Sequence, residues 1–239
     1  MTDLLRPAVT PGHSVIVLIQ NGLNIERPVM AAFPSNIVLS GVSFCGSHEK
    51  APGEIVHEYP DRIFFGAFRG PSPVSAAAAS TTSTSTSTAP LPTTTALDST
   101  GNQQREELEK QADAEAQAFT AIYGAAGKCE AAYSPDVSFT RWRKLLYNAC
   151  LNPICAITDL DTGRIRLADG AVEGLVRPAA EEIRAAAGAC GVVLPAELVG
   201  WSIELDPVTM YNPPSMQVDV QKVRSGWLGV IGGNLGFLC

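Results

Sequence analysis

The sequence of 239 residues has few histidines, no C-x-x-C pair and no long apolar run. Three histidines and six scattered cysteines argue against a structural zinc site or a disulfide framework, and favour reduced thiols inside the cell. Basic residues number 17 against 24 acidic ones, giving a net charge of −7, so the basic patch that nucleic-acid binding needs is not expected. The longest apolar run, residues 14–19, is too short to span a membrane, and the first residues do not form a signal peptide. We therefore expect a cytoplasmic protein without a metal, nucleic-acid or membrane partner.

A stretch dominated by Ser, Thr, Ala and Pro interrupts this ordinary composition at residues 71–100. Such a segment buries too little apolar surface to offset the entropy lost on ordering. The sequence therefore predicts a disordered insert there, with one foldable block before it and one after it.

The block before the insert, residues 1–70, has the pattern of an α/β domain. Apolar, β-branched runs at 13–22, 36–46, 53–59 and 62–68 predict strands, and residues 25–32 predict a short helix. The runs are continuous rather than alternating, which is typical of strands covered on both faces, as in a parallel sheet.

The chain after the insert is mostly helical in pattern. Helices are predicted at about 104–123, 139–156, 171–190 and 196–205. The fold class expected is α/β followed by all-α, with 1–70 and 101–134 in the first domain and 135–222 in the second.

The predicted helix 139–156 carries polar residues at one spacing. Lys144, Asn148 and Asn152 follow one another at i, i+4 and i+8, and so lie on one face. A second, apolar face is expected roughly opposite, from Phe139, Trp142, Leu146, Ala149 and Pro153. Unpaired burial of a Lys and two Asn would be costly, so these side chains either satisfy one another and the backbone or line a cleft that admits a polar ligand.

Four stretches of the chain resemble, in order, the motifs of the ketopantoate reductase (2-dehydropantoate 2-reductase) family. RWRKLLYNACLNPICAI resembles its W-x-K-L-x-x-N-x-x-x-N-P-x-x-A motif, and LIQNG resembles its Q-N-G strand end. GVSFCGSHEKAPGEIVHEY resembles the G-V … P-G-x-[IV]-x-H element, and NPPSMQVDV resembles the S-M-x-x-D helix start.

The resemblance implies a Rossmann-type nucleotide domain followed by a helical domain like that of 6-phosphogluconate dehydrogenase. It implies an oxidoreductase of pantothenate biosynthesis, which reduces 2-dehydropantoate or a related 2-keto acid to the 2-hydroxy acid with NADPH. By match to the motifs, Lys144 is the catalytic proton donor. The motif residues Asn148, Asn152 and Ser215 contact the substrate, as does Thr162, which stands where relatives often have Asn. Asn21 lies near the nicotinamide of NADP(H). The resemblance leaves the oligomeric state open.

Three departures qualify this expectation. No G-x-G-x-x-G opens a helix after an N-terminal strand, so the chain is expected to lack the first part of the nucleotide domain and the loop that binds the pyrophosphate. Residues 223–239 form an atypical tail, with Trp227 where the family has a substrate-binding glutamate. The insert 71–100 stands where relatives have a shorter connection.

These departures leave alternatives to an active enzyme. One is a non-catalytic remnant or interaction module of the same family, and another is a small-molecule binder that keeps the polar face of the helix without chemistry. Three further residues within these stretches are given structural roles: His57 is expected to pack at a strand end, and Cys150 and Cys155 to be buried, inert thiols.

Overall fold

The computed structural model describes residues 2–69, 99–209, 211 and 213–224. The chain divides into two compact units, Met1–Thr140 and Arg141–Cys239. Almost all of the expected insert and most of the expected tail, including Trp227, lie outside the described residues. Within the described ranges, no helix is both long and apolar enough to cross a bilayer.

The first unit is built on a four-stranded sheet in the order β1-β2-β5-β6. The strands are β1 (Ile16–Leu18), β2 (Val38–Ser43), β5 (Asp61–Ala67) and β6 (Cys129–Tyr133). The β1–β2 and β5–β6 pairs are parallel, whereas β2 and β5 run antiparallel, with Gly41 opposite Phe65. The sheet is therefore mixed and not parallel throughout, because β5 returns to the sheet from a hairpin.

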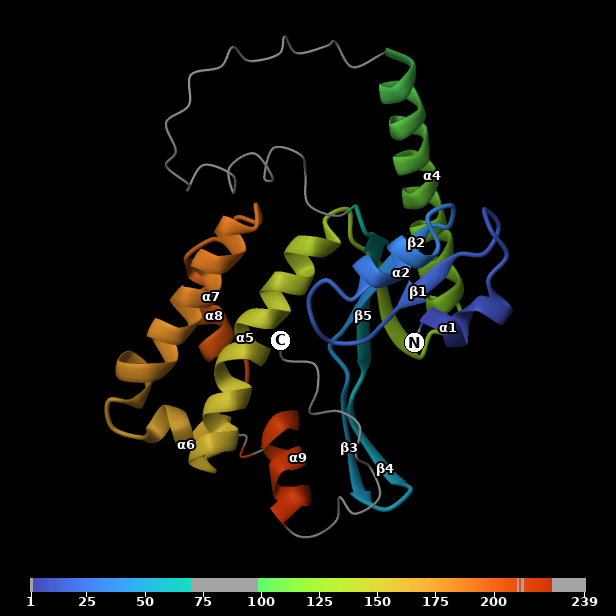
Figure 1. Cartoon of the computed structure of the whole chain (residues 1–239). Helices are drawn as coiled ribbons and strands as arrows, with labels where there is room; N and C mark the ends of the chain where they lie inside the picture. The colour runs from blue at the N-terminus through green and yellow to red at the C-terminus, as the bar shows by residue number, and fades with distance from the viewer. Residues whose placement is uncertain (1, 70–98, 210, 212, 225–239) are drawn as a thin grey trace, which may run out of the picture. The chain divides into compact units, whose positions relative to one another are not determined.

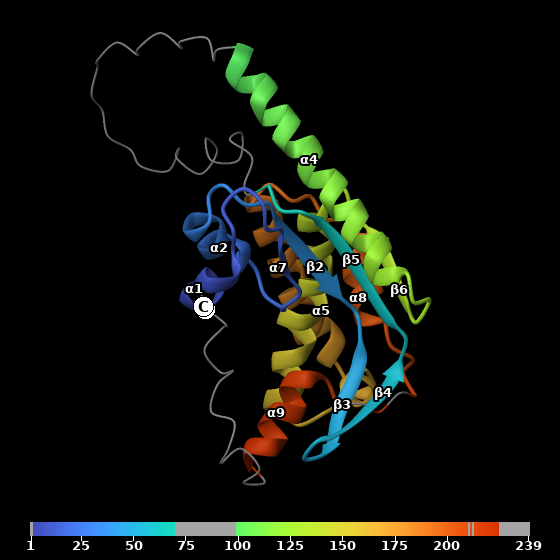
Figure 2. The ribbon, with the colours of Figure 1, turned by 90° about the vertical axis from the view of Figure 1, so that its right-hand side faces the viewer.

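Helices cover both faces of this sheet, which explains the continuous apolar runs of its strands. On one face, α2 (Glu26–Ala32) packs against alternate residues of β1 and β2, with Val29 buried against Ile16 and Val38. On the other face, α4 (Ser99–Gly124) runs along β5 and β6 (Figure 2), where Phe119 meets the ring of Phe65 edge-on at 4.9 Å between centroids. A short helix α1 (Thr2–Leu5) and a 3-10 turn (Arg6–Ala8) precede β1.

Strands β3 (Gly46–Ala51) and β4 (Glu54–Tyr59) form a separate antiparallel hairpin, which extends from the end of the sheet (Figure 1). The ladder has register shifts between Gly46 and Ser47 and between Glu49 and Ala51. Strand β3 was not expected, because its sequence GSHEKA is polar on both faces and carries no strand pattern.

The second unit is helical in the residues that the structure describes. Its elements are α5 (Val137–Thr158), which begins at the end of the first unit, α6 (Thr162–Leu167), a π-helical turn (Val172–Val176), α7 (Arg177–Ala189), α8 (Glu197–Ile203) and α9 (Ser215–Arg224).

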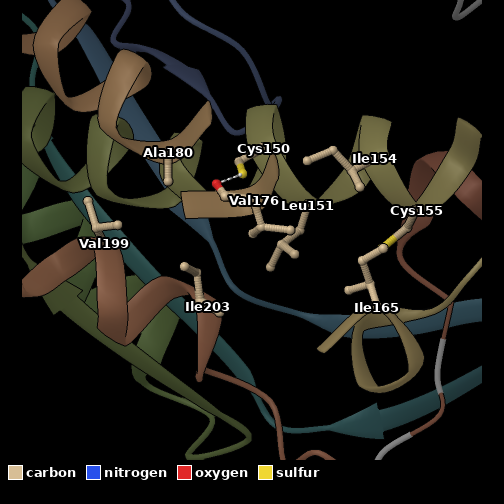
Figure 3. Packing of buried hydrophobic residues seen from close by; sticks show 9 residues of the cluster. All are labelled: Cys150, Leu151, Ile154, Cys155, Ile165, Val176, Ala180, Val199 and Ile203. Atoms are coloured by element: carbon tan, nitrogen blue, oxygen red, sulfur yellow. Dashed lines mark hydrogen bonds between the residues drawn. The ribbon is translucent and has the colours of Figure 1, made fainter. Parts of the chain in front are cut away.

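The face of α5 that enters the core differs from the one expected. The buried cluster uses Cys150, Leu151, Ile154 and Cys155, with Tyr147 packed against it (Figure 3). Of the predicted apolar face, only Leu146 is fully buried, while Phe139, Trp142, Ala149 and Pro153 are half-buried. Because α5 is apolar over most of its circumference, its periodicity does not identify the face that α7 and α8 cover.

Candidate functional site

The polar face of α5 borders the hydrophobic core. Lys144 and Asn148 are half-buried, and Asn152 is 5% exposed. At about 100° per residue, these three side chains lie beside Tyr147 and Leu151, which face the core cluster. The stripe is therefore a partly buried surface and not the solvated side of a surface helix.

Asn152 is the buried member of this stripe, and its Oδ1 has no hydrogen-bond partner among the described residues. An unsatisfied buried amide oxygen costs about 1–3 kcal/mol of stability, and native proteins keep such groups rarely. The next residue, Pro153, lies inside α5 and has no N–H to offer the Ala149 carbonyl. This part of α5 consequently presents unused acceptor capacity, which suits a ligand with a hydroxyl donor.

Thr162 is buried at the first position of α6, directly after the N-cap Asp161, whose carboxylate accepts from the Arg164 N–H at 2.8 Å. The Tyr147 hydroxyl donates to Asp206 Oδ2 at 2.6 Å. Burial first, and then Asp206, raise the pKa of Tyr147 above its ordinary value, while a hydrogen bond with Thr162 acts in the opposite direction. Thr162 therefore belongs to a network that joins α5 and α6.

Ser215 is the first residue of α9 and is exposed, at the end of a helix where backbone N–H groups favour anions. Gln217 and Gln221 of the same helix donate to Asp159 Oδ1, at 3.3 and 3.0 Å. These bonds join α9 to the end of α5 and so fix where Ser215 lies relative to that end. Gln217 is 2% exposed, and its Oε1 is without a partner in the described part of the chain.

Asn21 lies in the first unit, in the exposed loop that follows β1. Two left-handed residues shape this loop: Gly22 with φ of 113° and Asn24 with φ of 59°. Since β1 and β2 are parallel, the loop stands at the carboxyl end of adjacent strands, where α/β sheets bind their ligands. The structure thus groups five of the six predicted site residues in the second unit and places Asn21 in the first.

Glu26 is a site-adjacent residue that sequence reasoning missed. It is fully buried at the start of α2, and its Oε1 accepts a 2.6 Å hydrogen bond from Ser40 Oγ of β2. This bond ties the end of the Asn21 loop to the sheet. An acid in a first helical turn is usually exposed, so the sequence gives no signal of its burial. Gln217 was also missed, although it lies within the recognised S-M-x-x-D motif.

The described residues contain no cluster of three or more His, Cys, Asp or Glu that could hold a metal. Burial raises the pKa of Cys150 to about 11 and that of Cys155 to about 12, and the Cys150 thiol donates to the Val176 carbonyl at 3.1 Å (Figure 3). The prediction that both thiols are buried is confirmed.

An α/β unit of Rossmann type followed by a helical unit is the architecture of a class of nicotinamide-dependent dehydrogenases, and the expected fold class is confirmed. Family comparison narrows this class. The model described as Ketopantoate reductase PanE/ApbA matches residues 1–70, and the model of its C terminal matches residues 136–235. The chain belongs to the ketopantoate reductase family.

Solved structures agree with this assignment. A 2-dehydropantoate 2-reductase from Methylococcus capsulatus is 29% identical, with a TM-score of 0.63 over 94% of this chain and 57% of that chain. The enzyme of the same name from Geobacter metallireducens is 25% identical, with a TM-score of 0.63 over 92% of this chain and 60% of that one. D-mandelate dehydrogenase, solved with NADH and anilino(oxo)acetate, shares the fold at 15% identity and a TM-score of 0.65 over 93% of this chain and 58% of its own.

An uncharacterized protein of Saccharomyces cerevisiae is 29% identical over an alignment of 251 residues. The alignment covers 98% of this chain and 60% of the relative. The chain therefore spans about 60% of the length of the relatives it matches.

Proposed function

We propose that the protein is an NADPH-dependent reductase of 2-keto acids, with 2-dehydropantoate as the first substrate to test and pantoate as its product. The observation that carries the proposal is the buried, unpartnered Oδ1 of Asn152 on the same face of α5 as Lys144 and Asn148. This arrangement is costly for folding and becomes useful when a substrate hydroxyl donates a hydrogen bond to this oxygen.

In this proposal Lys144 is the general acid. Reduction converts the carbonyl group to an alkoxide, with negative charge on its oxygen. The ammonium of Lys144 stabilises this charge and donates the proton that makes the oxygen a hydroxyl. Half-burial of Lys144 strengthens this interaction, because charges interact more strongly where water is partly excluded.

The remaining polar side chains bind and orient the substrate. The Asn148 and Asn152 amides hydrogen-bond the 2-oxygen and the carboxylate, and the Ser215 hydroxyl at the start of α9 takes the carboxylate. Thr162 contributes through its hydroxyl beside Tyr147. The Gln217 and Gln221 bonds to Asp159 hold Ser215 in place, so those glutamines are positioning residues.

The first unit is proposed to bind the nicotinamide end of NADP(H), which supplies hydride when bound. The loop after β1 suits this role, since Asn21 offers an amide and Gly22 takes a backbone conformation that other residues rarely adopt. Glu26 holds this loop through Ser40. The chain contains no G-x-G-x-x-G opening a helix, so its own residues supply no recognised pyrophosphate loop.

Cofactor binding and substrate binding are proposed to belong to different parts of the sequence. Residues 1–70 and 101–134 are proposed as the cofactor domain, 135–222 as the substrate domain, and the cytoplasm as the place of action. The competing function, a non-catalytic family member, draws support from two sequence departures: no recognised glycine-rich loop, and Trp227 where the family has a substrate-binding glutamate.

The test is an assay of NADPH oxidation by the purified chain with 2-dehydropantoate. Lys144→Ala is expected to lower kcat about 10²–10⁴-fold, the usual contribution of a positioned acid. Lys110→Ala, at an exposed lysine of α4, is the matched control and leaves the rate unchanged. Turnover that survives Lys144→Ala would overturn the assignment of the acid. NADPH binding too weak to measure would support the non-catalytic alternative.

A further inference from the structure

A cysteine and a histidine meet on the hairpin of the first unit, outside the proposed site. Cys45 is exposed in the connection between β2 and β3, and His57 is exposed on β4. The Cys45 Sγ lies 3.5 Å from His57 Nε2, within hydrogen-bonding range for sulfur. The expected packing role for His57 is therefore wrong, because its ring lies in solvent beside a thiol.

The hairpin ladder fixes this pair. Ser47 stands directly opposite His57 across the two strands, and the Cys45 thiol also reaches Ser47 Oγ at 3.7 Å. The Cys45 N–H donates to Ser43 Oγ at 3.2 Å, which holds the backbone that carries the thiol. Gly46, opposite Tyr59 in the ladder, lets the Tyr59 ring pack against the strand, since a Cβ there would lie 2.4 Å from Tyr59 Cδ2.

A carboxylate, Asp61, is linked to Cys45 through Ser43. Its two oxygens accept hydrogen bonds from Ser43 Oγ at 3.3 Å and from Tyr123 Oη at 2.8 Å. Both bonds spread the negative charge of Asp61 over neighbouring hydroxyls. Of the two described groups within hydrogen-bonding distance of this thiol, the imidazole is the one that can take its proton.

The other described cysteines lack such a partner or are shielded. Cys150 and Cys155 are buried in the second unit, and burial opposes the thiolate. The half-buried Cys129 donates its thiol proton to the Tyr123 carbonyl at 3.5 Å, and a carbonyl accepts a hydrogen bond without serving as a base. Cys190 is exposed, but it caps the C-terminus of α7, where the helix dipole disfavours a negative sulfur.

We propose that Cys45 and His57 form a peroxide-reactive modification site. The Cys45 sulfur attacks one oxygen of hydrogen peroxide, so that an S–O bond forms and the O–O bond breaks. His57 Nε2 takes the thiol proton and passes it to the departing hydroxide, which leaves as water. Sulfur is oxidised by two electrons to a sulfenic acid, and the peroxide is reduced by the same two. The reaction is independent of the proposed reductase activity.

The test combines hydrogen peroxide with dimedone, a carbon nucleophile that traps sulfenic acids, and measures each labelled cysteine by peptide mass spectrometry. In the folded, full chain, Cys45 is expected to be labelled at least about tenfold faster than Cys190, the other exposed cysteine among the described residues. His57→Gln removes the base and is expected to bring Cys45 down to the rate of Cys190.

The matched control is His48→Gln on the same hairpin, one residue beyond Ser47 and therefore on the opposite face of β3. This variant keeps the fast labelling of Cys45 if the proposal holds. Circular dichroism confirms that each variant is folded, which the exposure of both histidines leads us to expect. Equal labelling of Cys45 and Cys190, or fast labelling that persists in His57→Gln, would overturn the proposal.

Discussion

At the scale of one residue, Asn152 is expected to contribute to substrate binding and not to the stability of the fold. Because its Oδ1 is buried without a partner, Asn152→Leu replaces an unsatisfied group by an apolar one of similar size. The free energy of unfolding is expected to stay the same or rise by about 1 kcal/mol, measured by urea denaturation. Substrate binding is expected to be lost in the same variant.

The neighbouring Leu151 provides the comparison for that measurement. It is 1% exposed within the core cluster, so Leu151→Ala is expected to cost about 2–5 kcal/mol. A loss for Asn152→Leu as large as the loss for Leu151→Ala would show that the Asn152 amide is a structural group and not a binding group.

Tyr123 gives a prediction about pH. Its hydroxyl donates to Asp61, and this bond, with burial and the charge of Asp61, raises the pKa of Tyr123 to about 12. The unfolded chain has the ordinary tyrosine pKa of about 10, so the stabilisation by Tyr123 is complete below pH 10 and falls as the pH rises to 12.

The measurement for Tyr123 compares wild type with Tyr123→Phe by denaturant unfolding across this range. Their difference in unfolding free energy is expected to be constant up to pH 10 and then to shift against wild type. A difference that stays constant to pH 12 would show that Asp61 does not hold the Tyr123 proton in solution.

At the scale of the element, α6 depends on its N-cap. The Asp161 carboxylate accepts from the Arg164 N–H, and Asp161 is 2% exposed. Asp161→Ala is expected to lower stability by about 0.5–2 kcal/mol, whereas Asp161→Asn, which keeps a capping oxygen, loses less. Asp169→Ala at an exposed position controls for loss of charge. Equal losses from Asp161→Ala and Asp169→Ala would contradict the cap.

A glycine decides how β5 passes the start of α5. A Cβ on Gly66 would lie 2.3 Å from the Ser134 carbonyl oxygen and 2.8 Å from Val137 Cβ, so Gly66→Ala is expected to cost about 1–3 kcal/mol in thermal unfolding. Gly200 of α8 has open space around a Cβ, and Gly200→Ala is expected to stabilise by up to about 1 kcal/mol. A neutral Gly66→Ala would contradict this close packing.

The elements with strong local patterns were predictable from sequence, and those defined by their partners were not. The spacing of Lys144, Asn148 and Asn152 locates a helix, and the motif around it identifies the family. Strand β6 has the weak pattern CEAAY and forms because β5 pairs with it, at Phe65 opposite Tyr133. Cys45 and His57 meet because of the hairpin register and its bulge. Their separation of 12 residues along the chain gives no sign of this contact.

At the scale of the whole molecule, the chain keeps the two-part organisation of its family while spanning about 60% of the length of its relatives. The second unit holds five of the six proposed site residues. Substrate recognition is therefore expected to depend mainly on α5 and on the starts of α6 and α9. It can be tested by measuring substrate binding, without catalytic turnover.

The most direct test is a titration of the full, ¹⁵N-labelled chain with 2-dehydropantoate, observed by NMR. The side-chain amide signals of Asn148 and Asn152 are assigned with the variants Asn148→Asp and Asn152→Leu. Their chemical shifts are expected to change as 2-dehydropantoate is added and to level off when the site is saturated. Propionate, a carboxylate without the 2-oxygen, is expected to shift these amides less than 2-dehydropantoate does. Side-chain amides that do not move at saturating 2-dehydropantoate, or that move equally with propionate, would contradict the claim that this face of α5 binds a 2-keto acid.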